Sequence, residues 1–171
     1  MIIREALTND IPSLSKLARK TYSETFGEGL TPEQLKSILE NTRSEEYFKS
    51  VIDKDTILVA LINDSIVGYI QLSNVRYSVK GIRITDQDQA IHSIYVDSDF
   101  QGKGVGRSLM DAAFSHPRIK KAENIFIDVY SENTRALNFY TGYGFKTVGK
   151  IDFKIDEKII GFDLVLMKHA E

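Results

Sequence analysis

In the first third of the chain, apolar residues recur at helical spacing. A short strand is predicted at Ile2–Arg4, and the polar residues Thr8–Asp10 can cap the helix that follows. A second helix is predicted to begin at Thr31, because Thr31 can cap it and Pro32 suits its first position. Ser44 is predicted to cap a third, short helix. The three apolar stripes are Ile11, Leu14, Leu17, Ala18 and Tyr22; Leu35, Ile38 and Leu39; and Tyr47, Phe48, Val51 and Ile52.

From residue 56 onward the pattern changes to the short apolar runs of β-strands. Thr56–Ile62 and Ile66–Ser73 flank a turn and are predicted to form a hairpin, whereas the polar segment Asn74–Asp88 is predicted to be a loop. The further predicted strands are Gln89–Val96, Asn124–Tyr130, Lys146–Ile155 and Ile159–Lys168, and the further predicted helices are Ser108–His116, stopped by Pro117, and Asn133–Tyr143. This order predicts an α/β (α+β) fold with a mixed, mostly antiparallel sheet, flanking helices and one parallel βαβ step.

Length and composition bound the class of protein. With 171 residues, the chain is expected to form a single domain over residues 1–171. Hydrophobic residues make up 42% and charged residues 27%, as in ordinary globular proteins. No apolar run is long enough for a membrane span, and the N-terminus does not have the pattern of a signal peptide.

Charge and residue counts exclude several kinds of chemistry. The chain has no cysteine, which excludes disulfides and thiolate catalysis and fits a cytoplasmic location. The net charge of −2 does not favour nucleic-acid binding. The histidines His92, His116 and His169 are scattered without metal-ligand spacing, so no metal site is expected.

A glycine-rich turn between a predicted strand and helix is the segment most indicative of chemistry. Gln101–Arg107 reads QGKGVGR. The first amides of a helix have no intrahelical partner, and glycines let a diphosphate approach the backbone closely. The spacing fits neither a Walker loop nor a dinucleotide-binding loop, since Arg107 stands where the latter needs glycine. From the loop alone, a glycine turn that binds no ligand is as well supported as an anion site.

Two motifs together carry a family resemblance. Gln101, Gly104 and Gly106 match the pattern Gln/Arg-x-x-Gly-x-Gly/Ala, and Asn133 is followed seven residues later by Tyr140 and then by Gly-Phe. With these motifs the sequence resembles the GNAT superfamily of N-acetyltransferases, which use acetyl-CoA. The segment Arg19–Phe26 is similar to a bacterial branch that includes PaiA-type spermidine/spermine acetyltransferases.

The resemblance implies where acetyl-CoA binds. The sheet is expected to splay, so that the pantetheine arm pairs with the strand backbone, and the diphosphate is expected on the loop amides. Asn133 is expected to hydrogen-bond the pantetheine arm, and it also suits a helix N-cap. The residues implied for cofactor binding are Ile94, Tyr95, Val96, Gln101, Gly102, Lys103, Gly104, Val105, Gly106, Arg107 and Asn133.

The resemblance also implies catalytic roles. Tyr140 matches the family's general acid, which protonates the leaving thiolate. His92 stands where many relatives carry Glu, and an imidazole can serve as the base, although a hydrogen-bonded strand histidine is an equal alternative. Asp128 can bind a cationic amine, orient His92 or face water. Phe26 is expected on the substrate side together with Asp128.

The function implied by the resemblance is acetyl transfer from acetyl-CoA to a primary amine, expected to be a small cationic amine such as a polyamine. Two alternatives stay open: a protein N-terminal or lysine acetyltransferase, and a module that binds acyl-CoA without turnover. No metal, nucleic acid or membrane is expected to take part, and a homodimer is left open.

Overall fold

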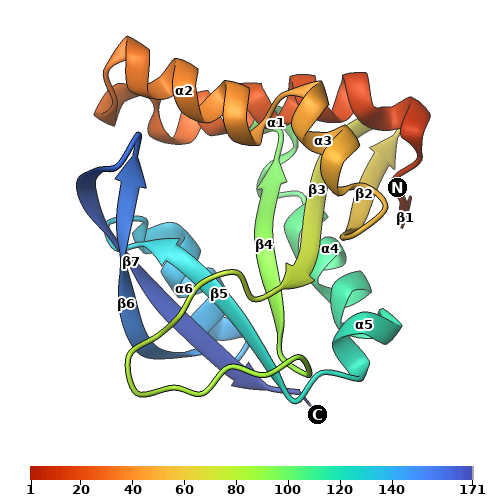
Figure 1. Ribbon diagram of the computed structural model, residues 1–171. Helices are drawn as coiled ribbons and strands as arrows, with labels where there is room; N and C mark the ends of the chain where they lie inside the picture. Colours follow the sequence, from red (N-terminus) through yellow and green to blue (C-terminus); the bar gives the residue numbers. More distant parts are fainter. Residues whose placement is uncertain (171) are drawn as a thin grey trace. The chain divides into compact units, whose positions relative to one another are not determined.

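The computed structural model describes residues 1–170 and contains a seven-stranded sheet in the order β1-β2-β3-β4-β5-β7-β6 (Figure 1). The strands are β1 (Ile2–Glu5), β2 (Thr56–Ile62), β3 (Ser65–Asn74), β4 (Gln89–Val96), β5 (Asn124–Tyr130), β6 (Lys146–Ile155) and β7 (Lys158–His169). The helices are α1 (Ile11–Phe26), α2 (Pro32–Thr42), α3 (Glu45–Val51), α4 (Val105–Ser115), α5 (Pro117–Lys120) and α6 (Thr134–Gly142). Single 3-10 turns lie at Thr8–Asp10, Gly27–Gly29 and Ser98–Phe100.

Strand pairing confirms the predicted fold class. β1 and β2, β2 and β3, β5 and β7, and β6 and β7 are antiparallel pairs, whereas β4 and β5 are parallel. The parallel register joins Gln89 to Ile125 and Ala90 to Phe126, all within the first three residues of their strands. The chain is therefore a mixed, mostly antiparallel sheet with one parallel βαβ step and flanking helices.

Cap residues set most helix boundaries. The start of α4 and the presence of the short helix α5 differ from the prediction. The hydroxyl of Thr31 accepts a hydrogen bond from the Gln34 amide at 3.2 Å, and the Gln34 side chain accepts one from the Thr31 amide at 2.9 Å, as the capping box predicts. Helix α4 begins at Val105, three residues earlier than predicted, because Gly104 adopts a left-handed conformation and is its N-cap. Pro117 begins the short helix α5, a position that suits proline because no intrahelical amide is needed there.

The described chain forms two compact units. Unit 1 comprises residues 1–72 and 93–116, and unit 2 comprises residues 73–92 together with the chain from residue 117 onward. The boundary falls inside β4, between His92 and Ser93. The expectation of a single domain stays a prediction.

In unit 1, helices α1 and α3 cover one face of β2 and β3. The core on this face includes Leu14 of α1, Phe48 of α3, and Val59 and Tyr69 of the strands, all fully buried. Helix α4 covers the opposite face and approaches the sheet at Gly68. A Cβ at Gly68 would lie 3.2 Å from side-chain atoms of α4 and 3.1 Å from a backbone oxygen of β4, so this close approach needs glycine.

Helix α2 of unit 1 packs less tightly than predicted. Its predicted apolar stripe, Leu35, Ile38 and Leu39, is only half-buried, and no residue of the helix is fully buried. Helices need a buried face for most of their stability in a protein. Helix α2 therefore buries little side-chain surface against the rest of unit 1.

In unit 2, the segment predicted to be a polar loop packs on the sheet. Val79 is buried with Phe126 of β5 and Val165 of β7. Figure 1 shows this segment crossing in front of β5 and β7. The apolar side chains that join this cluster are Val75, Tyr77, Ile82 and Ile84, at every second or third position of an otherwise polar stretch. The segment has no strand or helix of its own because its apolar residues follow neither period for long enough.

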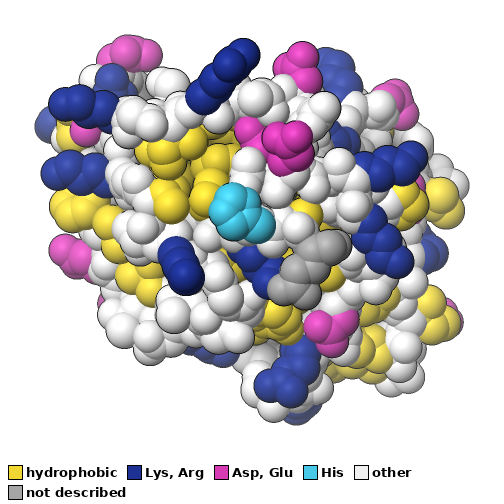
Figure 2. Space-filling view, turned by 90° about the horizontal axis from the view of Figure 1, so that it is seen from below, with side chains coloured by type: hydrophobic (Ala, Val, Ile, Leu, Met, Phe, Trp, Pro, Cys, Tyr) yellow, Lys and Arg dark blue, Asp and Glu magenta, His cyan; other side chains and the backbone are white. Residues whose placement is uncertain are grey.

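The surface carries both signs of charge. On the face shown in Figure 2, basic and acidic side chains are interspersed among hydrophobic and uncharged ones. None of the helices within residues 1–170 has the length and apolar character needed to span a bilayer.

Candidate functional site

The glycine loop of unit 1 has the backbone that an anion site needs. Gly102 and Gly104 have φ angles of 72° and 82°, and a Cβ at either would meet no atom within 4 Å. The first helical hydrogen bond of α4 runs from the Ser108 amide to the Gly104 carbonyl at 3.0 Å. The amides before Ser108 therefore lie outside the helical ladder, at the positive end of the helix dipole. This loop fits a phosphate or diphosphate.

Side chains tie the loop to the end of β4. The Gln101 side chain donates a hydrogen bond to the Val96 carbonyl at 3.0 Å. The Asp97 amide donates to the Val67 carbonyl at 2.9 Å, and Lys20 forms an ion pair with the Asp97 carboxylate at 2.9 Å. Because these contacts fix the turn on its strand side, the start of the loop is held before any ligand binds.

The predicted cofactor-binding residues of unit 1 differ in what they can offer a ligand. Gly102, Lys103, Gly104 and Arg107 are exposed, and the Lys103 ammonium lies 5.3 Å from the centre of the Phe100 ring. Val105 is 1% exposed and packs in the core, so only its backbone amide can reach a ligand. The half-buried predicted residues are Ile94, Tyr95, Val96 and Gly106.

Helix α6 of unit 2 carries the second predicted motif. The Asn133 side-chain oxygen accepts a hydrogen bond from the Ala136 amide at 3.1 Å, so Asn133 is the N-cap of α6. Tyr140 lies seven residues on and is 4% exposed. Its ring makes edge contacts with Phe139 at 5.4 Å and with Phe145 at 6.1 Å between centroids. Packing therefore fixes the tyrosine in one orientation.

His92 and Phe26, two other predicted residues, are both half-buried. His92 ends the part of β4 that belongs to unit 2, two residues beyond the last parallel pairing at Ala90. Phe26 ends α1 in unit 1, and its ring lies 4.8 Å from that of Tyr22.

Asp128 lies in an acidic cluster that the sequence analysis did not identify. Burial raises the pKa of Asp128, and the Tyr77 phenol faces its carboxylate. Burial and the Asp128 charge together raise the pKa of Asp163 to about 7. Burial and the two aspartates also raise the pKa of Tyr77. Asp128 is half-buried beneath the segment around Tyr77, and its role stays a prediction.

Asp163 carried the same sequence signal as Asp128, a lone acid between apolar strand residues. It stands between Phe162 and Leu164, as Asp128 stands between Ile127 and Val129. Tyr77 carried no such signal, because it lies in a segment of mixed polarity. The three side chains come together only because the segment around Tyr77 packs on strands formed much later in the chain.

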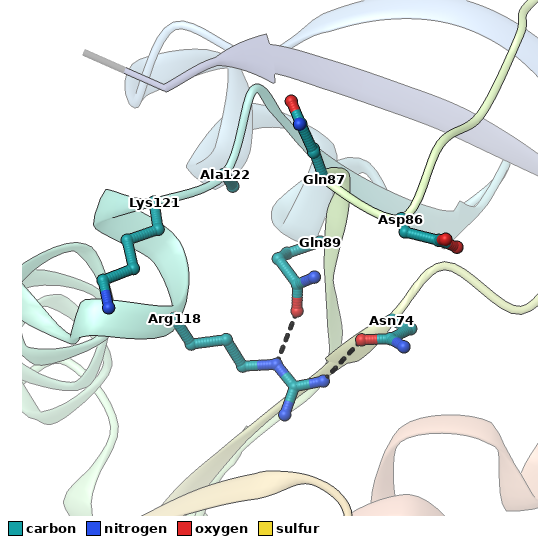
Figure 3. Close-up of a pocket in the computed structure, with 7 residues that line it drawn as sticks. All are labelled: Asn74, Asp86, Gln87, Gln89, Arg118, Lys121 and Ala122. Carbon is teal, nitrogen blue, oxygen red and sulfur yellow. Dashed lines mark hydrogen bonds between the residues drawn. The ribbon is translucent and has the colours of Figure 1, made fainter.

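A separate pocket of about 350 Å³ lies in unit 2 and contains none of the predicted residues (Figure 3). Its lining residues are Asn74, Asp86, Gln87, Gln89, Arg118, Lys121 and Ala122. The Arg118 guanidinium donates to the side-chain oxygens of Gln89 and, at 2.8 Å, of Asn74 (Figure 3). These bonds link α5 to the ends of β3 and β4, so Arg118 has a clear structural role.

Solved structures share this fold along nearly the whole chain. The PaiA N-acetyltransferase from Thermoplasma acidophilum, solved in complex with coenzyme A, aligns with a TM-score of 0.78 over 98% of both chains at 20% identity. A protein from Streptococcus mutans aligns with a TM-score of 0.76 over 100% of both chains at 24% identity. At these identities the likeness concerns the fold.

Sequence comparison identifies the family. Residues 11–145 match the acetyltransferase (GNAT) family, and the chain belongs to it. An uncharacterized N-acetyltransferase of Lactobacillus delbrueckii is 25% identical over 137 residues, which are 79% of this chain and 78% of that protein. The spermine/spermidine N(1)-acetyltransferase of Bacillus subtilis is 30% identical over 67 residues, which are 39% of this chain and 43% of that enzyme.

Membership confirms that the chain is an N-acetyltransferase and that acetyl-CoA is its acetyl donor. The glycine loop of unit 1 has the open amides and positive end that the diphosphate of this donor needs. Within residues 1–170, no group of three or more His, Cys, Asp or Glu side chains is arranged to hold a metal ion.

Proposed function

We propose that the chain transfers the acetyl group of acetyl-CoA to a primary amine of a small cationic molecule such as a polyamine. The observation that carries the proposal is the cluster of Asp128, Asp163 and Tyr77 on one sheet face of unit 2. Two carboxyl groups of raised pKa gain most from a cation that approaches them, because the cation favours their charged forms. The local identity to a polyamine acetyltransferase of Bacillus subtilis agrees with it.

Each reacting group has a proposed role. The amine nitrogen attacks the thioester carbonyl carbon, a C–N bond forms and the C–S bond breaks. His92 accepts the proton that the amine loses, and Tyr140 donates a proton to the thiolate that leaves. Asp128 holds the cationic acceptor, and Phe26 contacts its alkyl part.

In unit 1, the backbone at Ile94, Tyr95 and Val96 pairs with the pantetheine arm in this proposal. The loop amides of residues 102–107 bind the diphosphate, and Lys103 and Arg107 add positive charge. Gln101 acts by holding the loop, as its hydrogen bond to Val96 supports. The location we propose is the cytoplasm, which the absence of cysteine supports.

A panel of acceptors tests the proposal through release of free coenzyme A thiol. Spermidine, spermine and putrescine are compared with peptides that begin with Ser or Ala and with a peptide that contains an internal lysine. We expect higher kcat/KM for the polyamines. Faster acetylation of either peptide class would instead favour a protein-modifying enzyme. No thiol release with any of the acceptors would mean that the chain holds acyl-CoA without transfer.

The matched variant is Asp128→Asn, which keeps the shape of the side chain and removes its charge. It should raise KM for spermidine more than it lowers kcat. Asp152→Asn, an exposed aspartate on β6, is the control and should leave KM unchanged. A homodimer stays a prediction that light scattering on the purified chain can test.

A further inference from the structure

Arg43 of unit 1 is a buried cation without an acidic partner. It ends helix α2 as its C-cap and is 8% exposed. The carbon of its guanidinium lies 4.9 Å from the centre of the Tyr22 ring and 5.4 Å from that of Tyr95. Two aromatic faces therefore hold the guanidinium in place.

The charge of Arg43 is not neutralised by the protein. One terminal nitrogen donates a hydrogen bond to the Thr42 carbonyl at 2.7 Å, and the Nε atom is buried without a hydrogen-bond partner. Within residues 1–170, no carboxylate pairs with this guanidinium. Burial acts to lower the pKa of Arg43, but the facing phenol oxygens of Tyr69 and Tyr95 outweigh burial and raise it, so the group stays charged. A buried charge without a counter-charge is costly.

Two further buried donors lie in the same part of unit 1. The hydroxyls of Tyr69 and Ser93 are both buried, and neither has a hydrogen-bond partner beyond the other. Tyr69 faces the Arg43 guanidinium, and the Ser93 hydroxyl lies beside the Tyr69 phenol. Each buried polar group left unsatisfied costs about 1–3 kcal/mol. One unpaired guanidinium donor beside two buried hydroxyls is chemically complementary to a small anion.

The cover over this cluster is thin. Helix α2 (Figure 1), whose C-cap is Arg43, has no fully buried residue, and Tyr47 and Tyr95 are only half-buried. Deeper in the core, Tyr69 and the neighbouring Phe48 are both 0% exposed, so packing holds the Tyr69 side of the cluster in place.

We propose that Arg43, Tyr69 and Ser93 bind a carboxylate group. The guanidinium supplies the charge and the Nε donor, and the two hydroxyls donate to the carboxylate oxygens. Ser93 is also next to Ile94 on β4, the strand proposed to carry the pantetheine arm. The carboxylate comes either from a free small acid or from the acceptor itself, which is then an amine that also bears a carboxylate. The second source rests on the proposed function, whereas binding of a free carboxylate does not.

Thermal unfolding with added acetate tests binding without any turnover. The melting temperature of the wild-type chain should rise with sodium acetate at constant ionic strength, by linkage. Tyr69→Phe and Ser93→Ala should each weaken this response about tenfold in apparent acetate affinity, as expected for a hydrogen bond to a charged group. Without acetate, each variant should lose little stability, because each hydroxyl has no partner beyond the other.

Tyr77→Phe is the matched control, since Tyr77 also has a buried hydroxyl but lies in unit 2, where it faces Asp128. It should keep the full acetate response. Arg43→Gln should abolish the response, and the two hydroxyl variants keep the test readable if Arg43→Gln does not fold. An unchanged melting temperature of the wild type in acetate would overturn the proposal and leave water as the occupant.

Kinetics with lysine and cadaverine distinguish the two sources, because these molecules differ only in the carboxylate. If the acceptor supplies the carboxylate, lysine has the higher kcat/KM, acetate competes with it, and Tyr69→Phe lowers the preference about tenfold. If a free acid binds, cadaverine is acetylated as well as lysine while acetate still raises the melting temperature. Loss of transfer to both amines would contradict the proposed function and leave the acetate result intact.

Discussion

The carboxyl groups of Asp128 and Asp163 lie on neighbouring strands of unit 2, two register positions apart, and the charge of Asp128 disfavours the charged form of Asp163. The pKa of Asp163 rises to about 7. Burial is the larger cause and the Asp128 charge the smaller one. The pair therefore links the stability of unit 2 to pH in the neutral range.

Asp163→Asn should make stability less dependent on pH. An acid with a pKa of about 7 in the folded chain and about 3.9 in the unfolded chain keeps its proton preferentially when folded. The free energy of unfolding of the wild type should therefore fall as pH rises from about 4 to about 7. Asparagine resembles the protonated acid, so the variant should melt at a higher temperature than the wild type at pH 8 and at a similar temperature at pH 4.

Calorimetry or circular dichroism at both pH values measures this difference. Asp152→Asn changes an exposed aspartate on β6 and should show no such pH-dependent gain. An equal shift for Asp163→Asn at pH 4 and pH 8 would mean that the carboxyl does not titrate in this range.

Gly104→Glu should abolish acetyl-CoA binding. Gly104 is the N-cap of α4 with a φ of 82°, so any side chain there strains the backbone, while the space around it is open. Gly104→Ala has the same strain without the charge and is the matched control. Isothermal titration should show weakened binding for alanine and none for glutamate, because the carboxylate repels the diphosphate. Similar affinities for the two variants would contradict the assignment of the loop.

The sequence predicted the elements that follow from local patterns. Apolar periodicity placed the helices and strands, and the cap residues Thr31, Ser44 and Asn133 act as predicted. The two family motifs predicted the glycine turn before α4 and the N-cap of α6. In each case the information lies within a few consecutive residues.

What the sequence did not predict depends on contacts between distant residues. The segment around Tyr77 was read as a polar loop, yet it covers Phe126 and Val165 because its scattered apolar residues meet a sheet formed much later in the chain. The raised pKa of Asp163 depends on this cover and on pairing with β5. Arg43 looked like any charged residue after a helix, since only the fold brings Tyr22 and Tyr95 to its two sides.

Asn133→Ala should reduce both stability and acetyl-CoA affinity, and the two effects can be separated. Loss of the cap that accepts from the Ala136 amide should cost about 1 kcal/mol of unfolding free energy. Asn133→Ser keeps an oxygen for the cap but removes the amide donor proposed for the pantetheine arm. Serine should therefore retain stability and lose acetyl-CoA affinity. If serine restores both, Asn133 acts only as a cap.

Tyr140→Phe should lower kcat about 10²-fold with little change in acetyl-CoA affinity, because the variant removes a proton donor used in the transition state. The ring keeps its contacts with Phe139 and Phe145, so stability should not fall. Tyr143→Phe is the control, since Tyr143 follows the same helix and also contacts Phe139, at 5.2 Å. A full kcat for Tyr140→Phe would mean that water protonates the thiolate.

His92→Ala should change the pH dependence of the reaction as well as its rate. A histidine base works only when neutral, so kcat/KM of the wild type should fall as pH decreases through the titration of His92. The alanine variant should lose this acidic limb and react about 10²-fold more slowly. Polyamine nitrogens also gain protons as pH falls, so both enzymes must be compared with one substrate. His116→Ala is the control, because His116 of unit 1 contacts Glu5 at 3.1 Å and has no proposed role in transfer. If the wild type and His92→Ala show the same acidic limb and similar rates, the amine loses its proton without this histidine, and His92 serves the structure of β4 alone.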